Sequence, residues 1–184
     1  MTAFSVAMLV GSARAGSINR KLAKAIERLA PADMQFVDVP MYDMPLYHGD
    51  LEPDRPAAVR DFTRAIAQAD AVSIVSPEFN RSIPAVLKNA IDWGSKPTAE
   101  NVWRDKVVGM TGTTPGAIGT AIGQQHLRQI LSILGSYVLP GEVYISFKTP
   151  DMIDDDGIVA DKGVEEFLRS YVERFHNYIA RMQR

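Results

Sequence analysis

The chain has 184 residues, of which 46% are hydrophobic and 23% are charged, which excludes a disordered chain and predicts one globular domain over residues 1–184. The 20 basic and 22 acidic residues give a net charge of −2, which argues against a nucleic-acid-binding surface and favours small-molecule partners. Because there is no cysteine, disulfides, thiolate metal sites and a cysteine nucleophile are excluded.

The first predicted element is a strand over residues 4–10, a compact apolar run that ends at Gly11. Both of its faces are apolar, which is typical of a buried strand in a parallel sheet. The run is too short to span a bilayer, and no other stretch approaches the roughly 20 apolar residues that a membrane helix needs. It also lacks the preceding basic residues of a signal peptide, so we expect a cytoplasmic protein without a membrane partner.

Helical and strand patterns then alternate along the chain. Apolar residues at three- and four-residue spacing indicate helices, and short β-branched runs indicate strands. The expected elements are a helix over 17–30, a strand over 34–39, a helix over 59–69, a strand over 71–75, a helix over 83–93, a strand over 106–110, a helix over 117–134, a strand over 143–147 and an amphipathic helix over 164–182. This alternation predicts an α/β fold with helices on both faces of a parallel sheet.

With five strands, the candidate architecture is a flavodoxin-like, doubly wound sheet in the order 2-1-3-4-5. In such a sheet the ligand crevice lies at the carboxyl ends of strands 1 and 3. The loops over residues 11–19 and 77–84 are therefore the expected site.

The first of these loops combines small residues, hydroxyl groups, one amide and one arginine between a strand and a helix. Unpaired backbone N–H groups and the helix dipole make such a position suitable for an anion. The candidate phosphate ligands are Ser12, Arg14, Ser17 and Asn19. A triphosphate-binding loop would need Gly-Lys-Ser/Thr, and a dinucleotide fingerprint would need a third glycine besides Gly11 and Gly16. The alternative is that Ser17 only caps the helix and that Arg14 is only a surface charge.

The second loop reads Pro-Glu-Phe-Asn-Arg-Ser-Ile-Pro over residues 77–84, and Leu-Lys-Asn-Ala-Ile-Asp-Trp follows over residues 87–93. Together with Gly-Ser-x-Arg-x-x-Ser-x-Asn over residues 11–19, these motifs resemble the NADPH-dependent FMN reductase family, near the bacterial quinone and chromate reductases. Residues 45–47 and 126–129 resemble the same proteins. The chain departs from the family at Phe79, where tyrosine is commoner, and Arg81 is not part of the motif.

The resemblance implies a flavoprotein oxidoreductase that binds FMN in a flavodoxin-like fold. In such an enzyme the flavin, and no catalytic side chain, takes hydride from NADPH or NADH and passes it to quinones or other small acceptors such as chromate, by a two-electron ping-pong mechanism. It also implies a homodimer or a homotetramer. An alternative function is a flavodoxin-type electron carrier, although such carriers usually present an acidic face and this chain is nearly neutral.

The resemblance also assigns site residues by motif position. The residues that would hold the FMN phosphate are Ser12, Arg14, Ser17 and Asn19. The residues that would border the flavin ring are Pro77, Glu78, Phe79 and Asn80, and Ser82 would support their loop. The other edge of the ring would be lined by Gly112 and Thr113, which follow strand 4. We predict no metal site, because the three histidines show no ligand spacing. Trp93 and Trp103 are interpreted as anchors at helix ends or at a subunit contact, and the helices over 83–93 and 117–134 as the interface.

Overall fold

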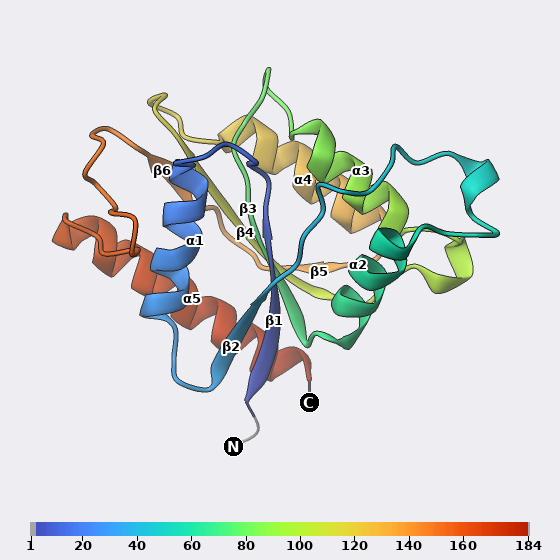
Figure 1. Cartoon of the computed structure of the whole chain (residues 1–184). Helices are drawn as coiled ribbons and strands as arrows, with labels where there is room; N and C mark the ends of the chain where they lie inside the picture. Colours follow the sequence, from blue (N-terminus) through green and yellow to red (C-terminus); the bar gives the residue numbers. More distant parts are fainter. Residues whose placement is uncertain (1–2, 184) are drawn as a thin grey trace.

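A parallel sheet lies between two layers of helices in the computed structural model, which describes residues 3–183 (Figure 1). The strands are β1 (Phe4–Val10), β2 (Met34–Asp38), β3 (Ala71–Val75), β4 (Val107–Thr114), β5 (Tyr137–Val138) and β6 (Tyr144–Ser146). The helices are α1 (Ile18–Leu29), α2 (Ala57–Gln68), α3 (Ala85–Gly94), α4 (Ala121–Ile133) and α5 (Lys162–Met182), with short 3-10 turns at Gly49–Leu51 and Thr98–Glu100. None of the helices described is long and apolar enough to cross a membrane.

The strand order is β2-β1-β3-β4-β5 with parallel pairing throughout, which confirms the predicted 2-1-3-4-5 arrangement. The strand expected over 143–147 is present as β6, but a second short strand that was not expected, β5, occupies the fifth position, and both strands pair with β4. Between them Pro140 has no N–H to donate to a ladder, and Gly141 turns the chain with a φ of 87°. Because β6 pairs with residues 112–114, β4 also extends beyond its predicted end at residue 110.

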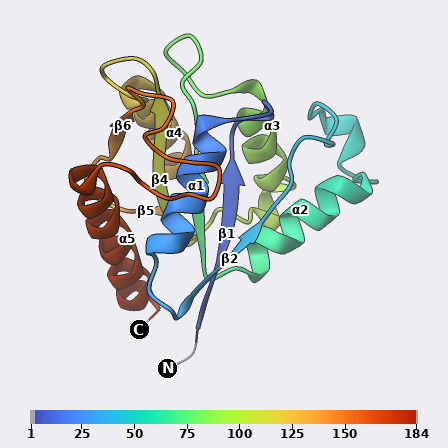
Figure 2. The same cartoon turned by 60° about the vertical axis from the view of Figure 1, so that its left-hand side comes forward.

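Each face of the sheet has its own hydrophobic core. Successive residues of β1 point to opposite faces, so Val6 and Met8 pack under α1 and α5 whereas Ala7 and Leu9 pack under α2, α3 and α4. Figure 2 shows α1 and α5 together on one side of the sheet. The burial on both faces explains why β1 and β3 are apolar along their length. Because the two strands are parallel, their carboxyl ends lie at the same edge of the sheet.

The two tryptophans belong to the core on the α2, α3 and α4 side. Both have a relative exposure of 0%, and Trp103 Nε1 donates a hydrogen bond to the carbonyl oxygen of Ile91 at 3.0 Å. Gly94 leaves room for this ring, since a Cβ there would lie 2.5 Å from Trp103 Nε1. Because both rings are fully buried within one chain, the interpretation as subunit contacts is wrong, whereas the alternative of an anchor at a helix end fits Trp93 in the last turn of α3.

Helix α3 holds the loop that follows β2. Asn89 Oδ1 accepts a hydrogen bond from the Tyr47 N–H at 2.9 Å, and its amide donates to the Pro45 carbonyl at 3.0 Å. Trp93 Nε1 donates to the same carbonyl at 2.8 Å, and its ring meets that of Tyr47 edge to face at 5.1 Å. Two of the segments that carry the family resemblance are thus one structural unit that fixes the β2–α2 connection.

Candidate functional site

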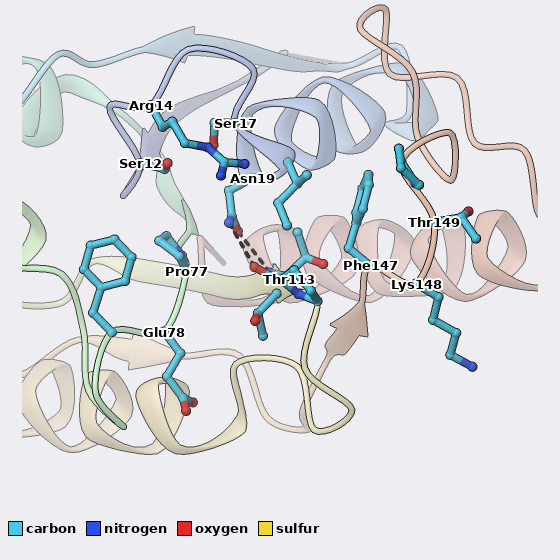
Figure 3. A pocket seen from close by; sticks show the side chains of 15 residues that line it. Ser12, Arg14, Ser17, Asn19, Pro77, Glu78, Thr113, Phe147, Lys148 and Thr149 are labelled. Carbon is cyan, nitrogen blue, oxygen red and sulfur yellow. Dashed lines mark hydrogen bonds between the residues drawn. The ribbon is translucent and has the colours of Figure 1, made fainter.

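The carboxyl edge of the sheet contains a cavity of about 580 Å³, shown in Figure 3. This volume lies within the range of roughly 300–1,000 Å³ that is usual for small-molecule sites. The cavity is lined by Ser12, Arg14, Ser17, Ile18, Asn19, Pro77, Glu78, Phe79, Thr113, Thr114, Pro115, Phe147, Lys148, Thr149 and Pro150. The predicted loops after β1 and β3 therefore meet at one site, at the crevice that the strand order indicates.

The β1–α1 loop forms one end of the cavity, where Figure 3 shows Ser12, Arg14 and Ser17 grouped together. Ser17 is the N-cap of α1, and its Oγ accepts a hydrogen bond from the Arg20 N–H at 3.3 Å, which leaves its own hydroxyl proton available. Arg14 is exposed and forms no ion pair with any residue between 3 and 183. Unpaired N–H groups at the start of α1 and one guanidinium make this end suitable for a phosphate.

Asn19 lies in the same wall, but its amide is engaged by the protein. Its Nδ2 donates to the Thr113 carbonyl and its Oδ1 accepts from the Thr113 N–H, both at 3.0 Å. The side chain is 2% exposed, and the pair joins the first turn of α1 to the end of β4 (Figure 3). Asn19 thus positions the start of α1 relative to the floor of the cavity.

The β3–α3 loop is a tight hairpin. Phe79 and Ser82 exchange two backbone hydrogen bonds of 2.9 Å, and the two residues between them have positive φ angles, 52° at Asn80 and 64° at Arg81. These angles are typical of a two-residue type I′ turn, which asparagine tolerates well. Phe79 lies on the cavity rim with 55% of its surface exposed, whereas Asn80 at the tip and Ser82 behind it do not line the cavity.

Two contacts attach this hairpin to α4. Glu78 Oε2 accepts a hydrogen bond of 2.8 Å from the Gly123 N–H, and the Glu78 side chain is only 9% exposed. The N-cap residue of α4, Thr120, makes no side-chain cap, so the carboxylate of Glu78 satisfies a backbone donor in the first turn of that helix. Ser82 Oγ also contacts His126 Nδ1 at 3.1 Å. In Figure 3 the Glu78 carboxylate accordingly points away from the residues of the β1–α1 loop.

The floor of the cavity is the end of β4. Thr113 lines it, with its Oγ1 donating to the Ile145 carbonyl at 2.9 Å. Gly112 does not line the cavity. It allows β4 to approach the residue that follows β3, since a Cβ at this position would lie 1.9 Å from the Ser76 carbonyl oxygen. Both residues were expected in a loop after strand 4, and the pairing of β6 with this segment instead keeps them in the strand.

The motifs did not indicate the wall formed by the segment after β6. This wall comprises Phe147, Lys148, Thr149 and Pro150. Since β6 is parallel to β4, its carboxyl end reaches the same edge of the sheet. The rule that ligands bind at the carboxyl ends of parallel strands would therefore have indicated residues 147–150. Figure 3 shows the ammonium of Lys148 directed away from the cavity. Among residues 3–183, no group of three or more His, Asp or Glu side chains is arranged to hold a metal.

The two ends of the cavity differ in chemistry in the way that FMN requires. One end offers Arg14, two serine hydroxyls and the N-terminus of α1 to a phosphate. The remaining walls are largely apolar, with Ile18, Pro77, Phe79, Pro115 and Phe147, which suits a flat aromatic ring. The one carboxylate in the lining, that of Glu78, is bound to α4. The residues present therefore fit an FMN molecule.

The sequence model of the family described as NADPH-dependent FMN reductase matches residues 4–150 of the chain. A 2-hydroxy-1,4-benzoquinone reductase from a Burkholderia species is 39% identical over 178 residues, which cover 96% of this chain and 97% of that protein. A quinone reductase from Escherichia coli strain K12 is 36% identical over 182 residues, covering 97% and 96%. Among solved structures, the flavoenzyme NAD(P)H:(acceptor) oxidoreductase FerB from Paracoccus denitrificans has a TM-score of 0.93 at 36% identity, covering 98% of this chain and 99% of that one.

Proposed function

Since the chain belongs to the NADPH-dependent FMN reductase family, and so is an FMN enzyme that uses NAD(P)H, we propose that it reduces quinones and other small acceptors. The observation that carries this proposal is the cavity at the ends of β1 and β3, with a cationic end for the phosphate and apolar walls for the ring. Relatives named quinone reductases that match nearly the whole chain support the choice of acceptor. We further propose that it acts in the cytoplasm, where NAD(P)H is available.

When FMN is bound, it supplies the hydride chemistry between NAD(P)H and the acceptor. The proposed tasks of the chain are binding and orientation: Ser12, Arg14 and Ser17 hold the phosphate, while Pro77 and Phe79 border the ring. Asn80 and Ser82 support the ring indirectly, since they shape and anchor the hairpin that carries Phe79. The lining residues include no nucleophile paired with a base, so no side chain is assigned a covalent or acid–base step.

The test of this function is NADPH oxidation by the purified, FMN-loaded protein with benzoquinone and no other protein present. We expect turnover that depends on the quinone, and a lower but measurable rate with chromate, which needs three electrons and hence more than one two-electron transfer. An electron carrier would instead turn over only after a partner protein is added. Absence of quinone-dependent oxidation with both NADPH and NADH would contradict the proposed function.

We propose a ping-pong mechanism, in which NADPH and the acceptor use the same face of the flavin in turn. The expected result is a set of parallel lines in double-reciprocal plots when NADPH is varied at several fixed quinone concentrations. Quinone in excess should inhibit competitively against NADPH. Intersecting lines would show that both substrates are bound together, and would contradict sequential use of one site.

Glu78 is proposed as a positioning residue, because its carboxylate is used to accept the hydrogen bond from the Gly123 N–H. Glu78→Ala is expected to lower the free energy of unfolding by about 0.5–2 kcal/mol, the usual effect of removing a helix cap. Glu78→Gln retains an acceptor oxygen and should keep most of the stability and of the NADPH oxidation rate. Thermal unfolding and steady-state rates measure both effects. If Glu78→Gln abolished turnover while FMN remained bound, a chemical role for the carboxylate would replace this one.

We also propose that the chain forms a homodimer or a homotetramer through α3 and α4. Support comes from exposed apolar side chains on and next to α4, namely Ile118, Ile122 and Ile133, the last of them 84% exposed. Light scattering at micromolar protein should give the mass of a dimer or tetramer, and Ile133→Glu should reduce it. A monomeric wild-type protein would refute the assembly.

A further inference from the structure

Arg81 occupies a backbone position that arginine rarely adopts. In the type I′ turn between Phe79 and Ser82, both central residues have positive φ angles, 52° at Asn80 and 64° at Arg81. Asparagine followed by glycine is the usual pair in such a turn, because glycine has no Cβ to clash in the left-handed region. Asn80 follows this preference and Arg81 does not. Residues in unfavourable backbone conformations cluster at functional sites, so the Arg81 side chain is a candidate for a role that glycine could not serve.

Within residues 3–183 the Arg81 guanidinium keeps its hydrogen-bond donors for a ligand. Its ion pair is with Glu78, and 3.7 Å separates Arg81 Nη1 from Glu78 Oε1. This separation is longer than the roughly 2.7–3.2 Å of an N–H···O hydrogen bond. A guanidinium carries its N–H donors in a fixed planar fork, which binds a group with two neighbouring anionic oxygens through two parallel hydrogen bonds.

The charge that this hairpin presents to solvent is positive. The Glu78 carboxylate is 9% exposed, and its Oε2 accepts the hydrogen bond from the Gly123 N–H at the N-terminal end of α4, so it is covered and compensated by the protein. The Arg81 side chain is 68% exposed. Lys88, the next cation along the chain, is held by both carboxylate oxygens of Asp92 at 2.7 Å. Arg81 therefore supplies the charge that a ligand meets at the hairpin.

The place of Arg81 relates it to the acceptor rather than to the flavin phosphate. That phosphate belongs to the opposite end of the cavity, on the β1–α1 loop with Arg14, so neither of them enters the charge at the hairpin. Phe79, two residues before Arg81, lies on the rim of the cavity and is proposed to border the flavin ring. An acceptor that reaches this ring passes the hairpin, where a negatively charged substituent can meet the guanidinium.

We propose that Arg81 is a specificity residue, which favours quinones that carry an anionic substituent over neutral quinones of similar size. The guanidinium binds the substituent through charge-assisted hydrogen bonds, and the flavin remains responsible for hydride transfer. The inference rests on the proposed function, because it concerns the acceptor of the same site. Since Arg81 lies outside the family motif, the preference belongs to this chain and is not implied by the family.

The experiment compares two acceptors of the FMN-loaded protein, neutral 1,4-naphthoquinone and its 2-sulfonate, whose charge does not change with pH. The measured quantity is the ratio of kcat/KM for the sulfonate to kcat/KM for the neutral quinone. We expect Arg81→Gln to lower this ratio about fivefold, the upper range for an exposed ion pair, and Arg81→Glu to lower it further. Arg81→Lys should retain part of the preference, because it keeps the charge but not the fork. The intrinsic reactivities of the two quinones cancel when variants are compared with the wild-type protein.

Arg81→Gly separates the effect of the charge from that of the backbone. Glycine is favoured at a positive φ, so the hairpin should be retained, and thermal unfolding should occur at or above the wild-type temperature. Its ratio should nevertheless fall as far as that of Arg81→Gln. The matched control is Arg64→Gln, which removes an exposed arginine on α2 and should leave the ratio unchanged. A wild-type ratio in Arg81→Gly would show that Arg81→Gln acts through the hairpin, and would overturn the inference.

The coenzyme provides the other decisive comparison. If Arg81 binds the additional phosphate of NADPH instead, Arg81→Gln should raise the KM for NADPH but not for NADH and leave the acceptor ratio unchanged, which would also overturn the inference. FMN affinity should stay at the wild-type value in every variant. A wild-type protein that reduces neither quinone contradicts the proposed function and the inference with it. Reduction of both quinones with a ratio that does not depend on Arg81 contradicts the inference alone.

Discussion

Replacement of Arg14 by alanine is expected to weaken FMN binding by roughly 10- to 100-fold while changing riboflavin binding little. Arg14 is the one guanidinium in the lining of the cavity, and it forms no ion pair within residues 3–183 that would have to be broken. A hydrogen bond to a charged group contributes about 1.5–3 kcal/mol, which corresponds to this range of affinity. Riboflavin has no phosphate, so its contacts with the ring walls are retained.

Quenching of flavin fluorescence during titration of the flavin-free protein measures both affinities. Arg64→Ala provides the matched control, because Arg64 is an exposed arginine on α2 whose contact is with Asp61. Its affinities for FMN and riboflavin should equal those of the wild-type protein. Equal affinity of the wild-type protein for FMN and riboflavin would show that the β1–α1 loop is not a phosphate site.

Replacement of Asn19 by alanine is expected to lower the free energy of unfolding by about 2–4 kcal/mol. The change removes two buried hydrogen bonds and leaves the N–H and carbonyl of Thr113 without these partners, in a residue with 0% exposure. Each buried polar group left unpaired costs about 1–3 kcal/mol. Because the same pair holds the start of α1 against β4, FMN affinity should also fall, although the amide of Asn19 is engaged with Thr113.

Urea unfolding followed by circular dichroism measures the change in stability, and the fluorescence titration measures the effect on FMN. Asn177→Ala is the control, since Asn177 is an exposed residue of α5 and its removal should alter stability by less than about 0.5 kcal/mol. An unfolding midpoint for Asn19→Ala equal to that of the wild-type protein would disprove the structural role of the pair.

Local patterns in the sequence were enough to predict the class of fold, the strand order and the two loops that line the cavity. Local patterns carry this information: the apolar runs of β1 and β3 report burial on both faces, and the helical spacing in α5 reports one buried stripe. The order 2-1-3-4-5 then follows from the general preference of alternating strands and helices, and it brings the loops over 11–19 and 77–84 together. The motifs in these loops were sufficient to identify the family.

The contacts of several of these side chains form only in the folded chain. The motif makes Asn19 a candidate phosphate donor, but in the structure its amide donates to the carbonyl of Thr113, 94 positions away in the sequence. Glu78 likewise faces Gly123, 45 positions away. The extent of β4 depends on its pairing with β6, and the fourth wall of the cavity depends on where β6 ends. Hydrogen-bond partners and sheet pairings between distant segments arise only from packing, so periodicity and local motifs do not determine them.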